Sequence, residues 1–229
     1  MNISIKASGI GMTSLRTRER LIERLTEQGI SDVRILEAMR DIPRHLFLDE
    51  AMASRAYEDM SLPIGHQQTI SQPYIVAKMT ETLIYHEKIN PTPLKKVLEI
   101  GSGCGYQTAV LSRFSYEIKS IERIRPLYVK AKKNLDGLNI RNVQLIHGDG
   151  LNVLEKDEKF DAILVAAAVP GEIIDGFVSH LEVGGRMVLP VETLGSQKLN
   201  VLHKTTKNKV EIFDLGEVLF VPLLIGAVY

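Results

Sequence analysis

Cysteine, net charge and long apolar runs are all scarce in this sequence. Cys104 is the only cysteine, which excludes an intrachain disulfide and a zinc site built from cysteine ligands. The 28 basic and 28 acidic residues balance one another, so net charge gives no reason to expect a nucleic-acid or membrane partner. The six histidines are scattered without metal-ligand spacing, and no metal is expected.

The N-terminal residues contain no apolar run long enough for the core of a signal peptide or for a membrane span. The sequence therefore predicts a cytoplasmic protein with no membrane partner. Residues 1–14 mix glycine, serine and isolated apolar residues, which is typical of a poorly ordered leader. The length of 229 residues fits one large domain or one domain with an appendage, and the composition, 45% hydrophobic and 24% charged, is that of an ordinary globular protein.

The first part of the sequence is expected to be mainly helical. Apolar residues recur at helical spacing over 16–28, and Asp32 is a typical N-cap for a second helix that ends before Pro43. The periodicity is then poor until Pro73, which suits the first position of a third helix running to about His86.

The remainder alternates short apolar runs with helical patterns. This alternation predicts an α/β fold with a doubly wound, mostly parallel sheet, and two final strand-like runs predict a closing antiparallel hairpin. The seven expected strands are 96–100, 117–121, 143–146, 160–166, 186–191, 198–205 and 210–221, and the expected helices begin at 106, 126 and 172. We divide the chain into a leader (1–14), a helical extension with a polar loop (15–92) and an α/β core (93–229), which together form one integrated domain.

A glycine-rich stretch, VLEIGSGCGYQTAVL, joins the first expected strand of the core to a helix. Gly101, Gly103 and Gly105 allow the backbone to approach a ligand closely at the carboxyl end of that strand. A dinucleotide fingerprint would place its third glycine where Tyr106 stands. Glu99 would repel a pyrophosphate, yet it suits a ligand with an ammonium group and a sulfonium, as in S-adenosylmethionine. Both features disfavour an NAD-dependent oxidoreductase.

Two further acids end the next strands of the core. Glu122 lies about 20 residues after Gly101, where an acidic side chain accepts hydrogen bonds from ribose hydroxyls in nucleotide-binding folds. Asp149 follows the third strand at the same edge of the sheet and could meet the adenine amino group. Each acid alone is more often a solvated strand end. In this order and spacing, the acids and the loop resemble the S-adenosylmethionine-dependent methyltransferase fold.

Absent motifs narrow the class of methyl acceptor. Methylases of exocyclic base amines usually carry Asp/Asn-Pro-Pro-aromatic after the fourth strand, where this chain has AAAVPG (166–171). Cytosine C5 chemistry needs a cysteine nucleophile after a proline, whereas Cys104 follows Gly103, and a small residue tolerated in a tight turn is the simpler interpretation. The alanine-rich end of the fourth strand also lacks the acids of metal-assisted catechol-type transfer.

The polar loop before the third helix carries the most specific motif. SLPIGHQQTISQPY (61–74) resembles the segment typical of protein-L-isoaspartate O-methyltransferases, in which a Pro-Ile-Gly turn leads into Gln-Thr-Ile-Ser. The resemblance extends over nearly the whole chain from about Leu21 and includes SIERI, HGDG, LEVGGRMVLPV and FVPL. Two positions depart from the family. Gln67 replaces a common glycine and would be strained if its φ is positive, and Val76 stands where some relatives have a histidine that meets the cofactor.

The resemblance implies methyl transfer from S-adenosylmethionine to the free α-carboxylate of L-isoaspartyl residues in damaged proteins, giving an ester that closes to a succinimide. An α-carboxylate with a pKa of about 3.5 is already ionised at neutral pH, so desolvation and positioning matter more than a catalytic base. The family's active-site serine aligns with Ser71, which would donate to that carboxylate as the catalytic residue. The alternative role for Ser71 is to cap the helix at Pro73.

The resemblance also implies the remaining site residues and partners. Substrate contacts are expected from Gln68, Thr69, Ile70 and Ser71, and cofactor contacts from Glu99, Gly101, Ser102, Gly103, Gly105, Glu122, Arg123, Asp149 and Gly150. The partners expected are isoaspartyl-containing proteins and peptides, without nucleic acid, and the chain is expected to be a monomer or weak homo-oligomer. Two alternatives stay open: an O-methyltransferase for a small molecule or RNA, and a catalytically silent S-adenosylmethionine-binding protein.

Overall fold

The computed structural model describes residues 9–85 and 93–229. Two amphipathic helices, α2 (Leu15–Glu27) and α3 (Val33–Asp41), build the N-terminal part. Asp32 caps α3, because its carboxylate accepts a hydrogen bond from the backbone N–H of Arg34 at 3.0 Å. Three short helices complete this part: η1 (Gly11–Thr13), η2 (Arg44–Phe47) and α4 (Glu50–Ala53). Residues 1–8 of the expected leader (1–14) lie outside the described residues. Its remaining residues include the short helix η1.

The expected α/β fold is confirmed. The main sheet has the strand order β10-β9-β8-β6-β3-β4-β5, parallel from β8 to β5 and antiparallel over β8, β9 and β10, with the short β7 paired to β8. The strands are β3 (Leu94–Ile100), β4 (Ser115–Glu122), β5 (Val143–His147), β6 (Phe160–Val165), β7 (Val169–Pro170), β8 (Leu181–Thr193), β9 (Ser196–Thr206) and β10 (Lys209–Glu217). The order of the strands reverses at β3, which has β4 on one side and β6 on the other. This position is a topological switch point.

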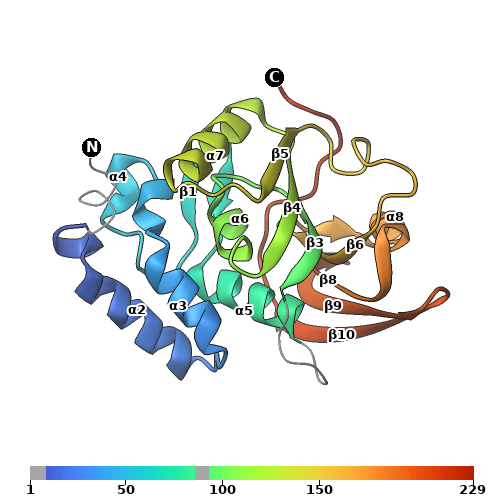
Figure 1. Ribbon diagram of the computed structural model, residues 1–229, viewed down its shortest axis with the longest axis horizontal. Coiled ribbons are helices and arrows are strands. Elements are labelled where there is room, and N and C mark those ends of the chain that lie inside the picture. Colours follow the sequence, from blue (N-terminus) through green and yellow to red (C-terminus); the bar gives the residue numbers. More distant parts are fainter. Residues whose placement is uncertain (1–8, 86–92) are drawn as a thin grey trace.

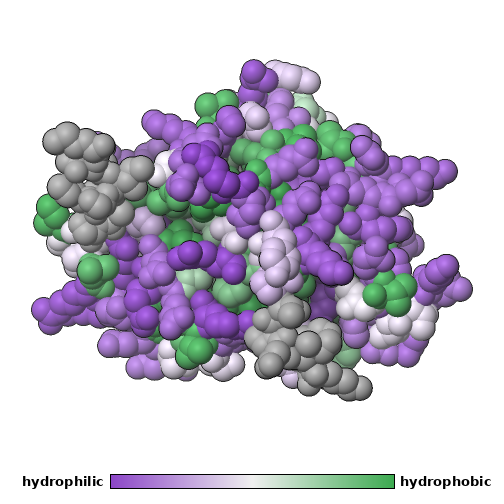
Figure 2. All heavy atoms as spheres, viewed as in Figure 1, coloured by the Kyte–Doolittle hydropathy of each residue, from purple (hydrophilic) through white to green (hydrophobic). Residues whose placement is uncertain are grey.

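Helices cover both faces of this sheet, and the N-terminal helices α2 and α3 lie beyond α5 and α6 at one end of the molecule (Figure 1). The core helices are α5 (Pro73–Ile84), α6 (Tyr106–Leu111), α7 (Arg125–Gly137), η3 (Gly171–Ile173) and α8 (Ile174–Ser179). One apolar cluster joins Leu21 and Phe47 to Tyr106 and Leu127, so the N-terminal helices share a core with α6 and α7. Figure 2 shows a mostly hydrophilic face with hydrophobic side chains in small separate groups.

Several predicted boundaries differ from the structure. The last expected strand, 210–221, ends at Glu217. Beyond it, Val218 still bonds the backbone carbonyl of Gln197 in β9, but Phe220 bonds the side chain of Gln197 and the regular strand pairing stops. The expected helix from 172 is a 3₁₀ turn followed by α8, and β8 begins earlier, at Leu181. Within the described residues, no helix is both long and apolar enough to cross a membrane.

The polar loop contains a β-hairpin that the sequence pattern did not predict. Strands β1 (Leu62–Gly65) and β2 (Gln68–Ile70) pair antiparallel, and His66 and Gln67 form the turn with φ values of 53° and 58°. Positive φ at both central positions is the pattern of a type I′ turn, which matches the twist of the strands and in which glycine or asparagine is preferred. Gln67 therefore does occupy a left-handed conformation, in which a side chain is strained.

Replacing Gln67 with glycine is expected to raise the free energy of unfolding by about 0.5–1 kcal/mol, because glycine adopts positive φ without steric cost. Urea denaturation of both proteins would measure it. Gln67→Ala is the matched control, since alanine keeps the Cβ atom and should bring no gain. An equal gain from alanine and glycine would show that the glutamine side chain, and not the backbone, causes the strain.

Candidate active site

The glycine loop lies between the carboxyl end of β3 and the start of α6. All three of its glycines have positive φ, and the N–H of Gly101 bonds the carbonyl of Ile121 at 2.8 Å. Gly105 is the N-cap of α6, and a Cβ atom there would lie 3.3 Å from Ala131 of α7. Gly105 therefore allows α6 and α7 to pack closely, while Gly101 and Gly103 border the cavity described next.

A cavity opens above this loop at the carboxyl edge of the sheet. It is lined by residues 68–71, 76, 100–104, 106, 107, 121–124, 127, 148, 150, 166, 167 and 221–224. All four expected substrate residues are among these, together with six of the expected cofactor residues: Gly101, Ser102, Gly103, Glu122, Arg123 and Gly150. The tertiary structure thus brings the polar hairpin and the glycine loop to one cavity.

Glu122 ends β4 at the wall of this cavity. Its two carboxylate oxygens accept hydrogen bonds from the backbone N–H groups of Gly103 and Ile124, both at 2.8 Å. The side chain is 4% exposed, and burial raises the pKa of the carboxyl group against the effect of these hydrogen bonds. Glu122 therefore ties the glycine loop to the strand end and presents an acceptor to a ligand in the cavity.

Glu99 lies beneath the loop and not at the cavity wall. One of its oxygens, Oε2, accepts from the hydroxyls of Ser120 and Thr108, each at 2.5 Å, whereas the buried Oε1 has no partner among the described residues. Complete burial raises the pKa of Glu99 to about 7, and the two hydroxyls oppose this rise only in part. Its charge can therefore act on a ligand only through the loop.

Asp149 is not among the residues that line the cavity, although its neighbours Gly148 and Gly150 are. Its Oδ2 accepts from the backbone N–H of Gly226 at 2.7 Å and from the side chain of Asn152 at 3.0 Å. The guanidinium of Arg123 donates to the carbonyl of Gly226 at 3.0 Å. The expected adenine-binding acid thus holds the C-terminal segment in place, and that segment contributes residues 221–224 to the cavity.

Ser71 lies at the junction of two cavities. A second cavity, lined by residues 61, 69, 71, 72, 75, 166 and 217–221, shares Thr69, Ser71, Ala166 and Val221 with the first. The N-cap of α5 is Gln72, whose side chain makes no capping bond, and the carboxylate of Asp59 accepts a hydrogen bond from the backbone N–H of Tyr74 in the first turn at 2.9 Å. Ser71 therefore does not have the capping role that was its alternative interpretation. It borders both the cofactor-side cavity and a route to the surface.

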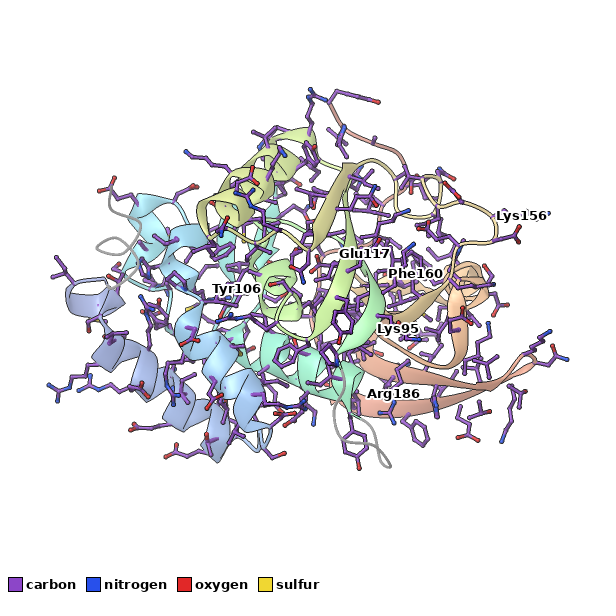
Figure 3. All side chains as sticks on the ribbon, in the orientation of Figure 1. Lys95, Tyr106, Glu117, Lys156, Phe160 and Arg186 are labelled. Atoms are coloured by element: carbon purple, nitrogen blue, oxygen red, sulfur yellow. The ribbon has the colours of Figure 1, made fainter. Side chains whose placement is uncertain are left out.

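Arg44 is a residue near the site that sequence reasoning missed. It is fully buried, and its guanidinium donates to the carbonyls of Ser71 at 2.8 Å and Ala56 at 2.9 Å. It also stacks over the ring of Tyr106 at 4.9 Å, and Figure 3 places Tyr106 on α6 beside the N-terminal helices. The N-terminal part therefore holds the backbone of Ser71. In the sequence, nothing in the pattern around Arg44 distinguishes it from an arginine at the surface, so its buried role could not be predicted.

Neither a cysteine nucleophile nor a bound metal ion is supported by the described residues at this site. Burial raises the pKa of the Cys104 thiol to about 11, so it is protonated at neutral pH and is a poor nucleophile. Across residues 9–85 and 93–229, no cluster of three or more histidine, cysteine, aspartate and glutamate side chains could hold a metal ion. The polar groups at the cavity suit the binding and positioning of ligands.

A doubly wound sheet with a glycine loop at its switch point and an acid ending the adjacent strand defines a Rossmann-like methyltransferase core. Comparison with known proteins agrees. Residues 16–227 match the family described as protein-L-isoaspartate(D-aspartate) O-methyltransferase (PCMT). The chain belongs to this family.

Individual relatives cover nearly the whole chain. It is 54% identical over 228 residues to a protein-L-isoaspartate O-methyltransferase from Methylobacillus flagellatus, covering 97% of this chain and 98% of the relative. One from Nitrosomonas eutropha is 50% identical, with 99% of each chain covered. A solved protein from Plasmodium falciparum, described as a putative protein-L-isoaspartate O-methyltransferase in complex with S-adenosyl-L-homocysteine, superposes with a TM-score of 0.74 at 27% identity over 90% of this chain and 98% of that one.

Proposed function

We propose that this protein is a repair methyltransferase that transfers a methyl group from S-adenosylmethionine to the α-carboxylate of L-isoaspartyl residues in proteins and peptides. One observation carries the proposal: the Gln-Thr-Ile-Ser segment and the glycine loop line the same cavity. The family membership and the relatives described above support the same activity. The product is a methyl ester.

The residues present fit S-adenosylmethionine. Glu122 would accept hydrogen bonds from the ribose, and the glycine loop would lie against the nucleoside. Glu99, whose Oε1 has no partner among the described residues, would place negative charge near the loop when it is ionised. When bound, this cofactor supplies an electrophilic methyl group on a positively charged sulfur. A cation above Glu99 favours its ionised form, which burial alone disfavours.

Ser71 would donate its hydroxyl hydrogen to the substrate carboxylate and orient one oxygen toward the methyl carbon. No proton needs to be removed, because a carboxylate with a pKa of about 3.5 is ionised at neutral pH. Arg44 would keep Ser71 in position through its backbone carbonyl. Exclusion of water from the carboxylate and alignment with the methyl group would supply most of the rate enhancement.

Contacts with Gln68, Thr69 and Ile70 would favour extended peptide backbone, which suits substrates in flexible or unfolded segments. The second cavity, which Thr69 and Ser71 share, offers an approach for such a peptide from the surface. We further propose that the protein acts in the cytoplasm, as a monomer or a weak homo-oligomer. Gel filtration with light scattering tests the second point, and a stable tetramer would contradict it.

Matched peptides test the proposed activity. One peptide carries isoaspartate and the other normal aspartate at the same position, and both are incubated with methyl-labelled S-adenosylmethionine. We expect base-labile label in the isoaspartyl peptide and at least tenfold less in its partner. Equal labelling of both would contradict the substrate assignment. Cofactor binding without labelling of either peptide would favour the silent binding protein.

A further inference from the structure

Gln107 lines the same cavity as the glycine loop, but the function proposed above does not use it. It lies at the start of α6, and only 9% of its surface is exposed. Its Nε2 donates to Thr80 Oγ1 at 2.9 Å, and no hydrogen bond among the described residues uses its Oε1. One polar atom of a nearly buried side chain at the cavity therefore has no hydrogen-bond partner in residues 9–85 and 93–229.

The hydroxyl of Thr80 determines which end of this amide is free. Thr80 is fully buried in α5 and donates its hydroxyl hydrogen to the carbonyl of Val76 at 2.7 Å. A hydroxyl has a single hydrogen, so toward Gln107 it acts only as an acceptor. The NH₂ group of Gln107 must therefore face Thr80. Because Gln107 lines the cavity, Oε1 is the atom that it offers to a bound ligand, and this atom is an acceptor.

The order of the strands locates Gln107 relative to the ribose site. Glu122 ends β4 on one side of β3, whereas α5 contacts β6 and β8 on the other side. Thr80 and Val76 belong to α5, the helix that follows Ser71. A cofactor whose ribose meets Glu122 and whose methyl group reaches Ser71 therefore extends its amino-acid end toward the α5 side of the cavity, where Gln107 lies.

We propose that Gln107 is a cofactor-binding residue whose Oε1 accepts a hydrogen bond from the α-ammonium group of S-adenosylmethionine, with Thr80 as its positioning residue. This rests on the methyltransferase function proposed above. The amino-acid end of the cofactor carries a donor, the ammonium, and an acceptor, the carboxylate, and an amide oxygen selects the donor. A hydrogen bond to a cation is of the stronger, charge-assisted kind. Val76 also lines this cavity, but it has no polar side-chain atom and so cannot accept this hydrogen bond.

Cofactor binding without any peptide tests the proposal by calorimetry. Three ligands are compared: S-adenosylhomocysteine, its decarboxylated analogue, which keeps the amine, and 5′-methylthioadenosine, which lacks the amino-acid end. Gln107→Met keeps the side-chain length and removes the acceptor. This variant is expected to weaken the binding of the first two ligands about tenfold to a hundredfold and to change the affinity for the third by less than about twofold. Equal weakening of all three, or an effect on S-adenosylhomocysteine alone, would overturn the proposal.

Two further variants keep the result interpretable. Glu122→Gln is the matched control and is expected to weaken all three ligands alike, because all three contain the ribose. Thr80→Val releases the amide from its fixed orientation and is expected to weaken only the two amine ligands, several-fold; unchanged binding would refute the positioning role. Thermal unfolding confirms that each variant folds. Since these measurements involve no methyl acceptor, a failed isoaspartyl assay leaves them intact, and the two proposals can fail separately.

Discussion

Replacing Ser71 with alanine is expected to lower kcat for an isoaspartyl peptide about a hundredfold, while binding of S-adenosylhomocysteine and the free energy of unfolding stay nearly unchanged. The size of the loss is that typical of removing one hydrogen-bond donor aimed at the reacting oxygen. Stability should be spared because Ser71 makes no capping bond at α5, whose N-cap is Gln72. Steady-state kinetics, calorimetry and urea denaturation on the same preparation separate these effects.

Two control variants sharpen this test. Ser71→Thr keeps the hydroxyl and should retain much of the activity that alanine loses. Ser61→Ala removes a hydroxyl that borders only the second cavity and should change kcat less than about twofold. If Ser71→Ala instead cost about 1 kcal/mol of stability and left turnover intact, its function would be that of a helix cap.

Replacing Glu99 with glutamine is expected to stabilise the cofactor-free protein by on the order of 3 kcal/mol above pH 7 and to have little effect near pH 4.5. Burial raises the pKa of Glu99 from 4.5 to about 7, and each pKa unit corresponds to about 1.4 kcal/mol. The folded protein therefore holds a proton that the unfolded chain releases between these two values. The stability from this proton is complete below pH 4.5 and is lost as pH rises to about 7.

Urea denaturation between pH 4.5 and 8 measures this effect. Glutamine has no proton to lose and can still accept from Ser120 and Thr108, so the difference between variant and wild type should grow with pH. Glu182→Gln is the matched control, because Glu182 is exposed on β8 and its replacement should shift stability little at any pH. A gain from Glu99→Gln that is the same at every pH would contradict a proton-linked origin.

Ionised Glu99 should have opposite effects on stability and on cofactor binding: it destabilises the folded protein but should favour the positively charged cofactor. In the wild type, affinity for S-adenosylmethionine relative to S-adenosylhomocysteine should rise with pH through about 7, because ionised Glu99 attracts the additional positive charge of the sulfonium. In Glu99→Gln this ratio should be flatter with pH. A group that destabilises the empty protein would thus favour the charged cofactor, which is a known compromise at binding sites.

Local patterns in the sequence were enough to predict the architecture. Apolar runs such as 96–100 and 160–166, separated by helical spacing, determine a parallel sheet, because adjacent parallel strands need a crossover between them. The same patterns locate the glycine loop and the acid at the end of β4, since both follow directly from where a strand ends. These features depend on neighbouring residues only.

The tertiary structure alone decided how the site is assembled. The contacts of Ser71 with Arg44 and of Asp149 with Gly226 join residues far apart in the chain, and no local pattern encodes them. The hairpin at Gln67 was missed because its turn lacks the usual glycine. Glu99 lies beneath the cavity and not at its wall, because Ser120 and Thr108 take its hydrogen bonds inside the core. The sequence thus determined which elements form, whereas packing between distant segments determined which atoms reach the ligand.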